Sequence, residues 1–282
     1  MPDGAGAEGR ARPRRHVGLI LGAALTGVWI LAAIAAPVVA PQGFDVQHLE
    51  NAFQPPSPVH LFGTDDLGRD VLTRVLYGGR YTLSVAVSVV ALAGCAGMFA
   101  GAVAGYLGGW ADEGIMRGTE LVMAFPAIIL AMTIVVALGP GLLHAAIAMG
   151  LVWWPPYARL ARGEVLAVKH REYVQAARAI GQRPWGIFRR AILPGIVPGI
   201  MILATIDLGS AIVTGAGLSF LGLGATPPAP EWGAMVSAGR ELLAQWWVAT
   251  FPGLAIFLTV IGFNYIGDGI RDLLDPHRHG RA

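Results

Sequence analysis

The sequence has very little charge for its length, and this shortage decides its class. Only 13% of its 282 residues are charged, 55% are hydrophobic, and the mean hydropathy is +0.59. Soluble domains usually carry about 25% charged residues. A chain this apolar would aggregate in water, so we expect the lipid bilayer to be its solvent.

Cysteine and lysine are almost missing. Cys95 is the single cysteine, which excludes an internal disulfide and a cysteine-based metal cluster. Lys169 is the single lysine and follows a valine, whereas a phosphate-binding P-loop needs Gly-Lys. No H-E-x-x-H motif or serine elbow is present. We therefore expect no catalytic residues, no bound cofactor and no metal site in this chain.

Apolar runs, in contrast, are plentiful. They cover residues 17–40, 81–111, 121–158, 191–215 and 246–267, and Gly139-Pro140-Gly141 divides the third of these in two. Because a membrane span needs about 20 apolar residues, the runs predict an all-α membrane protein with six transmembrane helices. Their many glycines and alanines indicate that the helices pack closely.

The basic residues are distributed unequally between the two sides that six spans define. The segments on the side of both termini hold sixteen lysines and arginines, and the segments on the other side hold four. The positive-inside rule then places both termini in the cytoplasm. The predicted organisation is a tail at 1–16, a first span at 17–40, an extracytoplasmic loop at 41–80, a membrane domain at 81–267 and a tail at 268–282.

The N-terminal apolar run has a second interpretation, a cleaved signal peptide. Its length exceeds the usual signal core of about 7–15 residues. Its removal would also leave five spans and put the termini on opposite sides of the membrane, so we favour a retained first helix.

The loop at 41–80 contains two different patterns. Residues 54–58 read QPPSP, which excludes regular structure and predicts an extended linker. Asp66 is a candidate N-cap for a following helix, with apolar residues on one face and charged residues on the other. We interpret this helix as one that lies on the outer leaflet.

Two polar residues fall inside predicted spans, where they are costly. Asp207 lies deep in the fifth span. It is either a pathway-lining carboxylate that meets a polar or cationic group of a cargo, or a carboxylate that is paired inside the bundle. Asn264 lies in the sixth span and is a candidate interhelical hydrogen-bond partner or pathway residue.

Residues 162–194 form a long basic segment between two apolar runs. Strong helix formers predict a helix from Arg162 to Ile180, Gly181 is a candidate C-cap, and Pro184 fits the first position of a second helix. Pro194 marks the return to the membrane. The pattern fits either a surface for a partner protein or a hairpin that rests on lipid phosphates.

This segment resembles the EAA coupling loop of bacterial ABC-importer permeases, whose pattern is Glu-Ala-Ala, three residues, Gly, and a downstream Leu-Pro. The matching residues here are Gln175, Ala176, Ala177, Gly181, Leu193 and Pro194. Four further segments resemble the second permease subunit of the dipeptide/oligopeptide/nickel group. They are FGTDDLGRD at 62–70, GLSFLGLG at 217–224, PPAPEWG at 227–233 and GDGIRDLLDP at 267–276.

The resemblance implies the ABC-importer permease fold with a cytoplasmic helical coupling loop at 162–194, in a bacterial inner membrane. It implies four kinds of partner: a homologous permease subunit, two ATPase subunits that bind ATP and Mg²⁺ and contact the loop, an extracytoplasmic solute-binding protein, and membrane lipid. No nucleic acid is implied. The chain itself would be a non-catalytic subunit.

The resemblance is weaker on cargo and departs at one position. Di- or oligopeptides are the leading cargo, with nickel or another small solute as alternatives, and a secondary transporter without an ATPase is the rival mechanism. Gln175 stands where the family pattern has Glu. Glu172, one turn earlier, could supply the missing charge, so we include it among the coupling residues.

Overall fold

The structure is a computed structural model that describes the backbone of residues 14–274, and within that range it is built from helices. The long ones are α1 (Arg14–Val39), α2 (Val71–Leu107), α5 (Leu142–Val168), α8 (Leu193–Phe220) and α10 (Trp247–Leu274). The shorter ones are η1 (Leu49–Asn51), α3 (Gly109–Met123), α4 (Ala127–Leu138), α6 (Glu172–Ala179), α7 (Pro184–Ile187), the π-helical turn η2 (Phe188–Ile192) and α9 (Trp232–Gly239). Predicted tail residues 1–13 and 275–282 lie outside the described part.

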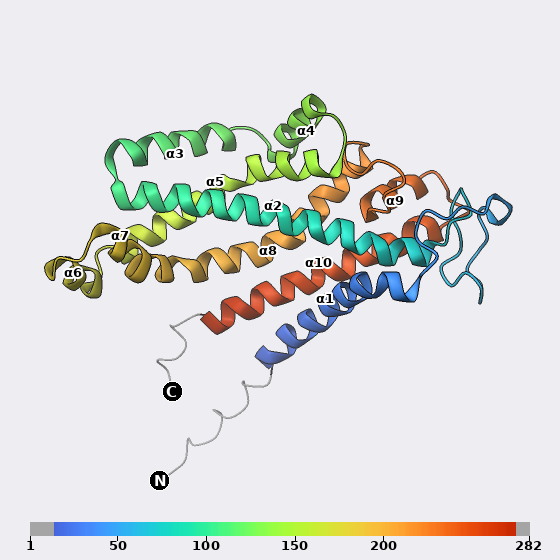
Figure 1. Cartoon of the computed structure of the whole chain (residues 1–282), viewed down its shortest axis with the longest axis horizontal. Helices are drawn as coiled ribbons and strands as arrows, with labels where there is room; N and C mark the ends of the chain where they lie inside the picture. Colours follow the sequence, from blue (N-terminus) through green and yellow to red (C-terminus); the bar gives the residue numbers. More distant parts are fainter. Residues whose placement is uncertain (1–13, 275–282) are drawn as a thin grey trace, which may run out of the picture.

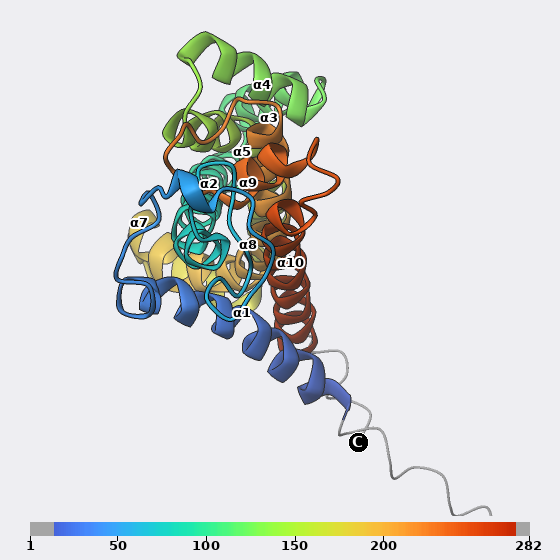
Figure 2. The same cartoon turned by 90° about the vertical axis from the view of Figure 1, so that its right-hand side faces the viewer.

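The long helices form one bundle (Figure 1). Helices α2, α5 and α8 run along one another, and α1 packs against α10. Figure 2 shows α1 and α10 beside the rest of the bundle. Residues 40–70 and 221–246, with α9, lie at one end, which we call the loop end. Residues 169–192, with α6 and α7, lie at the other, which we call the α6–α7 end.

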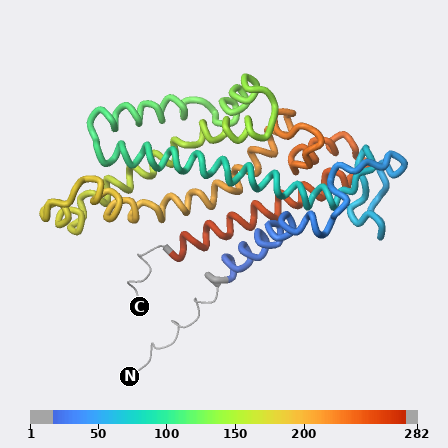
Figure 3. The backbone as a smooth tube through the Cα atoms, in the orientation of Figure 1, coloured from blue at the N-terminus to red at the C-terminus, as the bar shows by residue number. Residues whose placement is uncertain are grey.

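Four helical stretches are long and apolar enough to cross a membrane. They are 17–39, 71–107, 184–220 and 247–273. The pair α3 and α4 would be a fifth span if counted together, but the pair is bent by 87°. Figure 3 shows this break in the backbone. The segment predicted as one span from residue 121 is therefore divided into two helical pieces: Pro126, which precedes α4, lacks an amide hydrogen and interrupts the helix.

Close contact between α2 and α5 depends on small residues, as the composition predicted. Gly97, Gly101 and Gly105 are spaced one turn apart on α2 and face α5. A Cβ at Gly101 would collide with the carbonyl of Ala158, and one at Gly105 would lie 2.9 Å from the side chain of Val165. Only glycine lets the two backbones approach this closely.

The predicted helix from Asp66 is corrected by the structure. The N-cap is Asp70, whose carboxylate accepts a hydrogen bond from the amide of Thr73 at 2.8 Å. The helix that follows runs without a break for 37 residues, to Leu107. Residues 71–80 are thus the first turns of α2 rather than a separate interfacial helix, because the apolar run provides a continuous surface for packing.

Candidate functional site

The α6–α7 end carries most of the predicted coupling residues on one short helix. In α6, Val174 is fully buried and Ala177 is half-buried. Both pack into an apolar cluster with Ile187 and Ile192. Gln175 and Ala176 face outward and are exposed. The helix therefore has one side fixed to the bundle and one side free for a partner.

The turn between α6 and α7 is closed in the way that the sequence predicted. Gly181 adopts φ +74°, a left-handed conformation that favours glycine. Its amide donates to the carbonyl of Arg178 at 3.0 Å, and the amide of Gln182 donates to Ala177 at 3.1 Å. These bonds satisfy the last carbonyls of α6. Pro184 then opens α7 in the first turn, where its missing N–H is no loss.

Two hydrogen bonds attach this segment to the bundle, and a third closes the segment on itself. Lys169 donates from Nζ to the carbonyl of Gly105 at 3.0 Å. The Tyr106 hydroxyl donates to the carbonyl of Pro184 at 3.2 Å, and the Tyr173 hydroxyl donates to that of Ala191 at 3.4 Å. Two of the three bonds connect the last turn of α2 to the segment, so its position depends on α2.

A bidentate ion pair fixes the neighbouring helices. Arg162 on α5 donates to both oxygens of Asp112 on α3, with 2.6 Å between Nη2 and Oδ2. Two parallel N–H···O bonds give this kind of pair both strength and a defined geometry. The sequence analysis did not single out Asp112, because its partner is 50 positions away.

One expectation for the segment is corrected. The predicted single helix from Arg162 to Ile180 is broken, since α5 ends at Val168 and α6 begins at Glu172. Ile180, which follows the end of α6, is 75% exposed. The helix that contains Pro194 also begins before it. Helix runs without interruption from Pro184 through η2 and α8 to Phe220.

Asp207 lies halfway along α8, beside a cavity of about 370 Å³. Three segments around Asp207 complete the lining: α5, the end of α3 and the turn before α4. The lining residues are Val122, Met123, Phe125, Ala127, Val152, Trp153, Pro156, Leu203, Asp207 and Ser210. The fully buried Tyr157 faces the Asp207 carboxylate. An ionised residue at the centre of a membrane helix costs about 2.5–3.5 kcal/mol on insertion scales, so a charge here requires a reason.

Asn264 and Asp207 do not share this cavity. Asn264 lies on α10 and its side-chain oxygen faces Gly209 of α8. It is exposed, and it is not among the residues that line the Asp207 cavity. The structure therefore separates the two polar residues that the sequence analysis grouped as pathway candidates.

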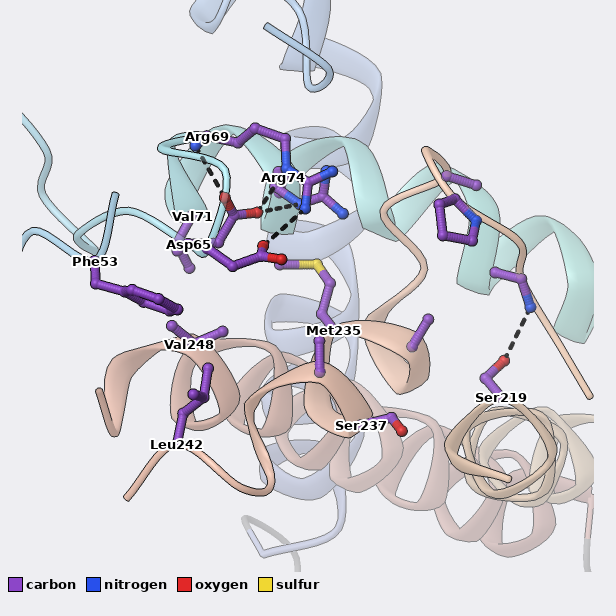
Figure 4. A pocket seen from close by; sticks show the side chains of 16 residues that line it. Phe53, Asp65, Arg69, Val71, Arg74, Ser219, Met235, Ser237, Leu242 and Val248 are labelled. Atoms are coloured by element: carbon purple, nitrogen blue, oxygen red, sulfur yellow. Dashed lines mark hydrogen bonds and ion pairs between the residues drawn. The ribbon is translucent and has the colours of Figure 1, made fainter. Parts of the chain in front are cut away.

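A second cavity, of about 500 Å³, lies at the loop end. Figure 4 shows Asp65 between Arg69 and Arg74 at its wall. Asp65 accepts Arg69 Nε at 2.7 Å and lies 3.4 Å from Arg74 Nε, and all three side chains are at least 89% buried. Because each charge faces an opposite one, this network serves to hold the loop against α2.

The rest of the loop end is organised around Trp232. Its side chain is fully buried, and the indole N–H donates to the carbonyl of Val75 at 2.8 Å. Glu231 caps α9 by accepting from the amides of Gly233 and Ala234, both at 2.9 Å. Thr82 of α2 donates to Glu231 and accepts from the amide of Trp232. The PPAPEWG motif therefore acts as a structural anchor on α2.

The FGTDDLGRD and GLSFLGLG motifs are also structural. The first supplies the carbonyl of Thr64, which accepts from the Trp247 indole at 3.0 Å. The second closes the end of α8 through the amide of Leu223, which donates to Leu218 at 2.9 Å. Across residues 14–274, no group of three histidine, cysteine or acidic side chains is arranged to hold a metal ion.

Comparison with known proteins reveals one family. Residues 97–280 match the model of the family described as binding-protein-dependent transport system inner membrane component. The probable D,D-dipeptide transport system permease protein DdpC of Escherichia coli (strain K12) is 43% identical over 263 residues, which cover 93% of this chain and 88% of the relative.

Two further relatives and one solved structure extend the comparison. The dipeptide transport system permease protein DppC of Alkalihalophilus pseudofirmus is 43% identical, over 91% of this chain and 85% of the relative. The glutathione transport system permease protein GsiD of Pectobacterium atrosepticum is 42% identical, over 93% of this chain and 88% of the relative. A structure of the inward-facing MetNI methionine ABC transporter aligns with a TM-score of 0.59 at 20% identity, over 72% of this chain and 97% of that one.

Proposed function

Because this chain belongs to the family of binding-protein-dependent transport system inner membrane components, we propose that its ABC importer carries di- or oligopeptides. The observation that carries this proposal is the 43% identity, over more than nine-tenths of the chain, to two permeases named for dipeptides. Glutathione is the second candidate cargo, since a relative named for it is 42% identical.

The proposed topology has six spans in the bacterial inner membrane, with both termini in the cytoplasm. Four long helices, the bent α3–α4 pair and the 27-residue α5 would make up the six. In this orientation the basic α6–α7 end is cytoplasmic and the loop end faces the solute-binding protein. Reporter fusions after residues 60 and 182 test it: the first should be active only outside the cytoplasm and the second only inside, and the reverse would refute it.

The proposed coupling surface is the exposed side of residues 172–181. Glu172, Gln175, Ala176 and Gly181 are exposed there, while Ala177 and Leu193 are partly buried behind them and Pro194 opens α8. An ATPase subunit that binds ATP and Mg²⁺ would contact this side. Since the opposite side is fixed to α2 through Tyr106 and Lys169, movement of the ATPase would be transmitted to the bundle.

The proposed solute pathway passes between this chain and a homologous permease subunit. Asp207 and Asn264 are its candidate polar residues, and both have surface that the described residues leave uncovered. A carboxylate and an amide facing lipid would be costly, which supports a location on the pathway side.

The test is transport by the complete complex. The chain is purified with its co-purifying subunits, reconstituted in proteoliposomes, and supplied with the solute-binding protein and radiolabelled L-alanyl-L-alanine. We expect accumulation only with ATP and only with the binding protein. The same vesicles receive labelled glutathione and labelled methionine as alternative cargos.

Each outcome decides between the hypotheses. ATP-dependent uptake of glutathione but not of the dipeptide would replace the cargo and keep the mechanism. Uptake that needs no ATP would support a secondary transporter and contradict the coupling role of residues 172–181.

A further inference from the structure

The carboxylate of Asp207 has no counter-ion in this chain. Within the described residues, no lysine, arginine or histidine forms an ion pair with it. Fourteen positions separate Asp207 from Leu193 and thirteen separate it from Phe220. At about 1.5 Å per residue, the carboxylate is about 20 Å from either end of α8, which the proposed topology puts near the middle of the membrane.

Besides the carboxylate, three polar groups near the cavity can accept a hydrogen bond: one backbone carbonyl and two hydroxyls. Pro156 has no N–H, so the carbonyl of Val152 loses its usual intrahelical donor, and both residues line the cavity. Ser210 lies one turn after Asp207 and lines it too. The hydroxyl of Tyr157, fully buried, makes no hydrogen bond within the described residues. The site has acceptors and lacks a cation.

We propose that this cavity binds the ammonium group of the solute during its passage. A primary ammonium carries one positive charge and three donors, which match the Asp207 carboxylate, the Val152 carbonyl and the Ser210 hydroxyl. Trp153 also lines the cavity, and an aromatic ring beside a cation stabilises it further. The remaining lining, Val122, Phe125 and Leu203, is apolar and suits a side chain. The inference rests on the proposed function and assigns its substrate class: solutes with a free amino group.

The cavity's charge preference can be measured without transport. Cys95 is replaced by Ala, and Ser210→Cys places a thiol in the cavity of the purified complex. Cationic 2-aminoethyl and anionic 2-sulfonatoethyl methanethiosulfonates are compared for their rate of modification. We expect the cationic reagent to react at least about tenfold faster, because an ionised carboxylate one helical turn away, with about 5–6 Å between the Cβ atoms, attracts it. Asp207→Asn should abolish the difference.

The ligand class is tested in the same complex by protection. Saturating L-alaninamide, a cation with one free amino group, should slow modification of Ser210→Cys at least threefold, whereas neutral N-acetyl-L-alaninamide should not. Leu203→Cys, at another position of the lining, repeats both measurements if the first variant does not assemble. Equal protection by the two compounds, or a charge preference that survives Asp207→Asn, would overturn the ammonium site.

A transport measurement separates this inference from the proposed function. With the same loaded binding protein, Asp207→Asn should reduce ATP-driven uptake of alanyl-alanine at least tenfold while the complex still assembles. Normal uptake by this variant would refute the ammonium site alone. Absence of dipeptide uptake by the wild type would refute the proposed cargo, and the labelling result would still decide the site. Failure of Asp207→Asn to assemble with its partner subunit would assign the carboxylate to a subunit contact and overturn the inference.

Discussion

The loop end and the α6–α7 end are held to the bundle by different means. At the loop end, Trp232 is fully buried and Asp65, Arg69 and Arg74 form a buried network of charges. At the α6–α7 end, most polar side chains are exposed, and three side chain–backbone bonds complement one apolar cluster. The motifs at the loop end are fixed by buried contacts, whereas α6 presents an exposed polar surface.

This difference divides the family motifs into those that stabilise the fold and those that are available to bind a partner. In the motifs at the loop end, FGTDDLGRD and PPAPEWG, polar groups form hydrogen bonds within the chain. The segment at the α6–α7 end leaves Glu172 and Gln175 without such bonds inside the described range. A motif whose side chains are satisfied internally maintains structure, and one whose side chains remain open is available to a partner.

The largest predicted effect is at Trp232. Trp232→Ala should lower the free energy of unfolding by about 3–5 kcal/mol, because it removes a buried indole and leaves a cavity. Trp185→Ala, at the other end, where the side chain is 68% exposed, is the matched control and should change it by less than about 1 kcal/mol. Thermal unfolding of the detergent-solubilised complex measures both. Similar losses would contradict the contrast between the two ends.

The ion pairs provide the next comparison. Asp65→Ala should cost about 3 kcal/mol, since it leaves two buried guanidinium groups without their common carboxylate. Asp112→Ala breaks the pair with Arg162, whose side chain is 36% exposed, and should cost about 1 kcal/mol because solvent replaces the partner. Chemical denaturation monitored by tryptophan fluorescence compares the variants. An equal cost would mean that burial does not distinguish the pairs.

Gly181 tests the turn of the coupling surface. Gly181→Val should strain the left-handed residue by about 1–2 kcal/mol, and because its surroundings are open, the cost should remain local. We expect reduced ATPase stimulation by the loaded binding protein, with normal assembly. Gly186→Ala, where the added methyl group also meets open space, is the control and should leave ATPase stimulation unchanged. Loss of assembly in the Val variant would show that the turn stabilises the bundle instead.

The smallest effect on stability, less than about 0.5 kcal/mol, is expected at Glu172. Glu172→Ala should reduce transport and ATPase coupling by about threefold, the size of a lost surface interaction of about 0.6 kcal/mol. Adding Gln175→Glu to that variant should restore coupling, because it returns the charge to the family position one turn away. Unchanged coupling in the single variant, or no recovery in the double one, would refute the role of Glu172.

The sequence predicted the helical class, the close packing through small residues, the Gly181 cap and the position of Pro184. These depend on local chemistry, which a short window of residues contains. It did not predict the Asp112–Arg162 pair or the anchoring of Trp232 to Val75, whose partners are 50 and 157 positions apart. It also failed where two local signals competed: Asp66 and Asp70 are both suitable caps, and packing against the bundle selected Asp70.

The uninterrupted helix from Pro184 to Phe220 has a mechanical consequence. Its 37 residues span about 55 Å at 1.5 Å per residue, so the residues beside α6 and the carboxylate of Asp207 belong to one continuous rod. If the end of this helix beside α6 tilts, each residue along it is displaced in proportion to its distance from the pivot, and Asp207 moves with it. The wide turn at η2, which carries an extra residue per turn, and Pro198 inside α8 are the two places where such a lever would bend.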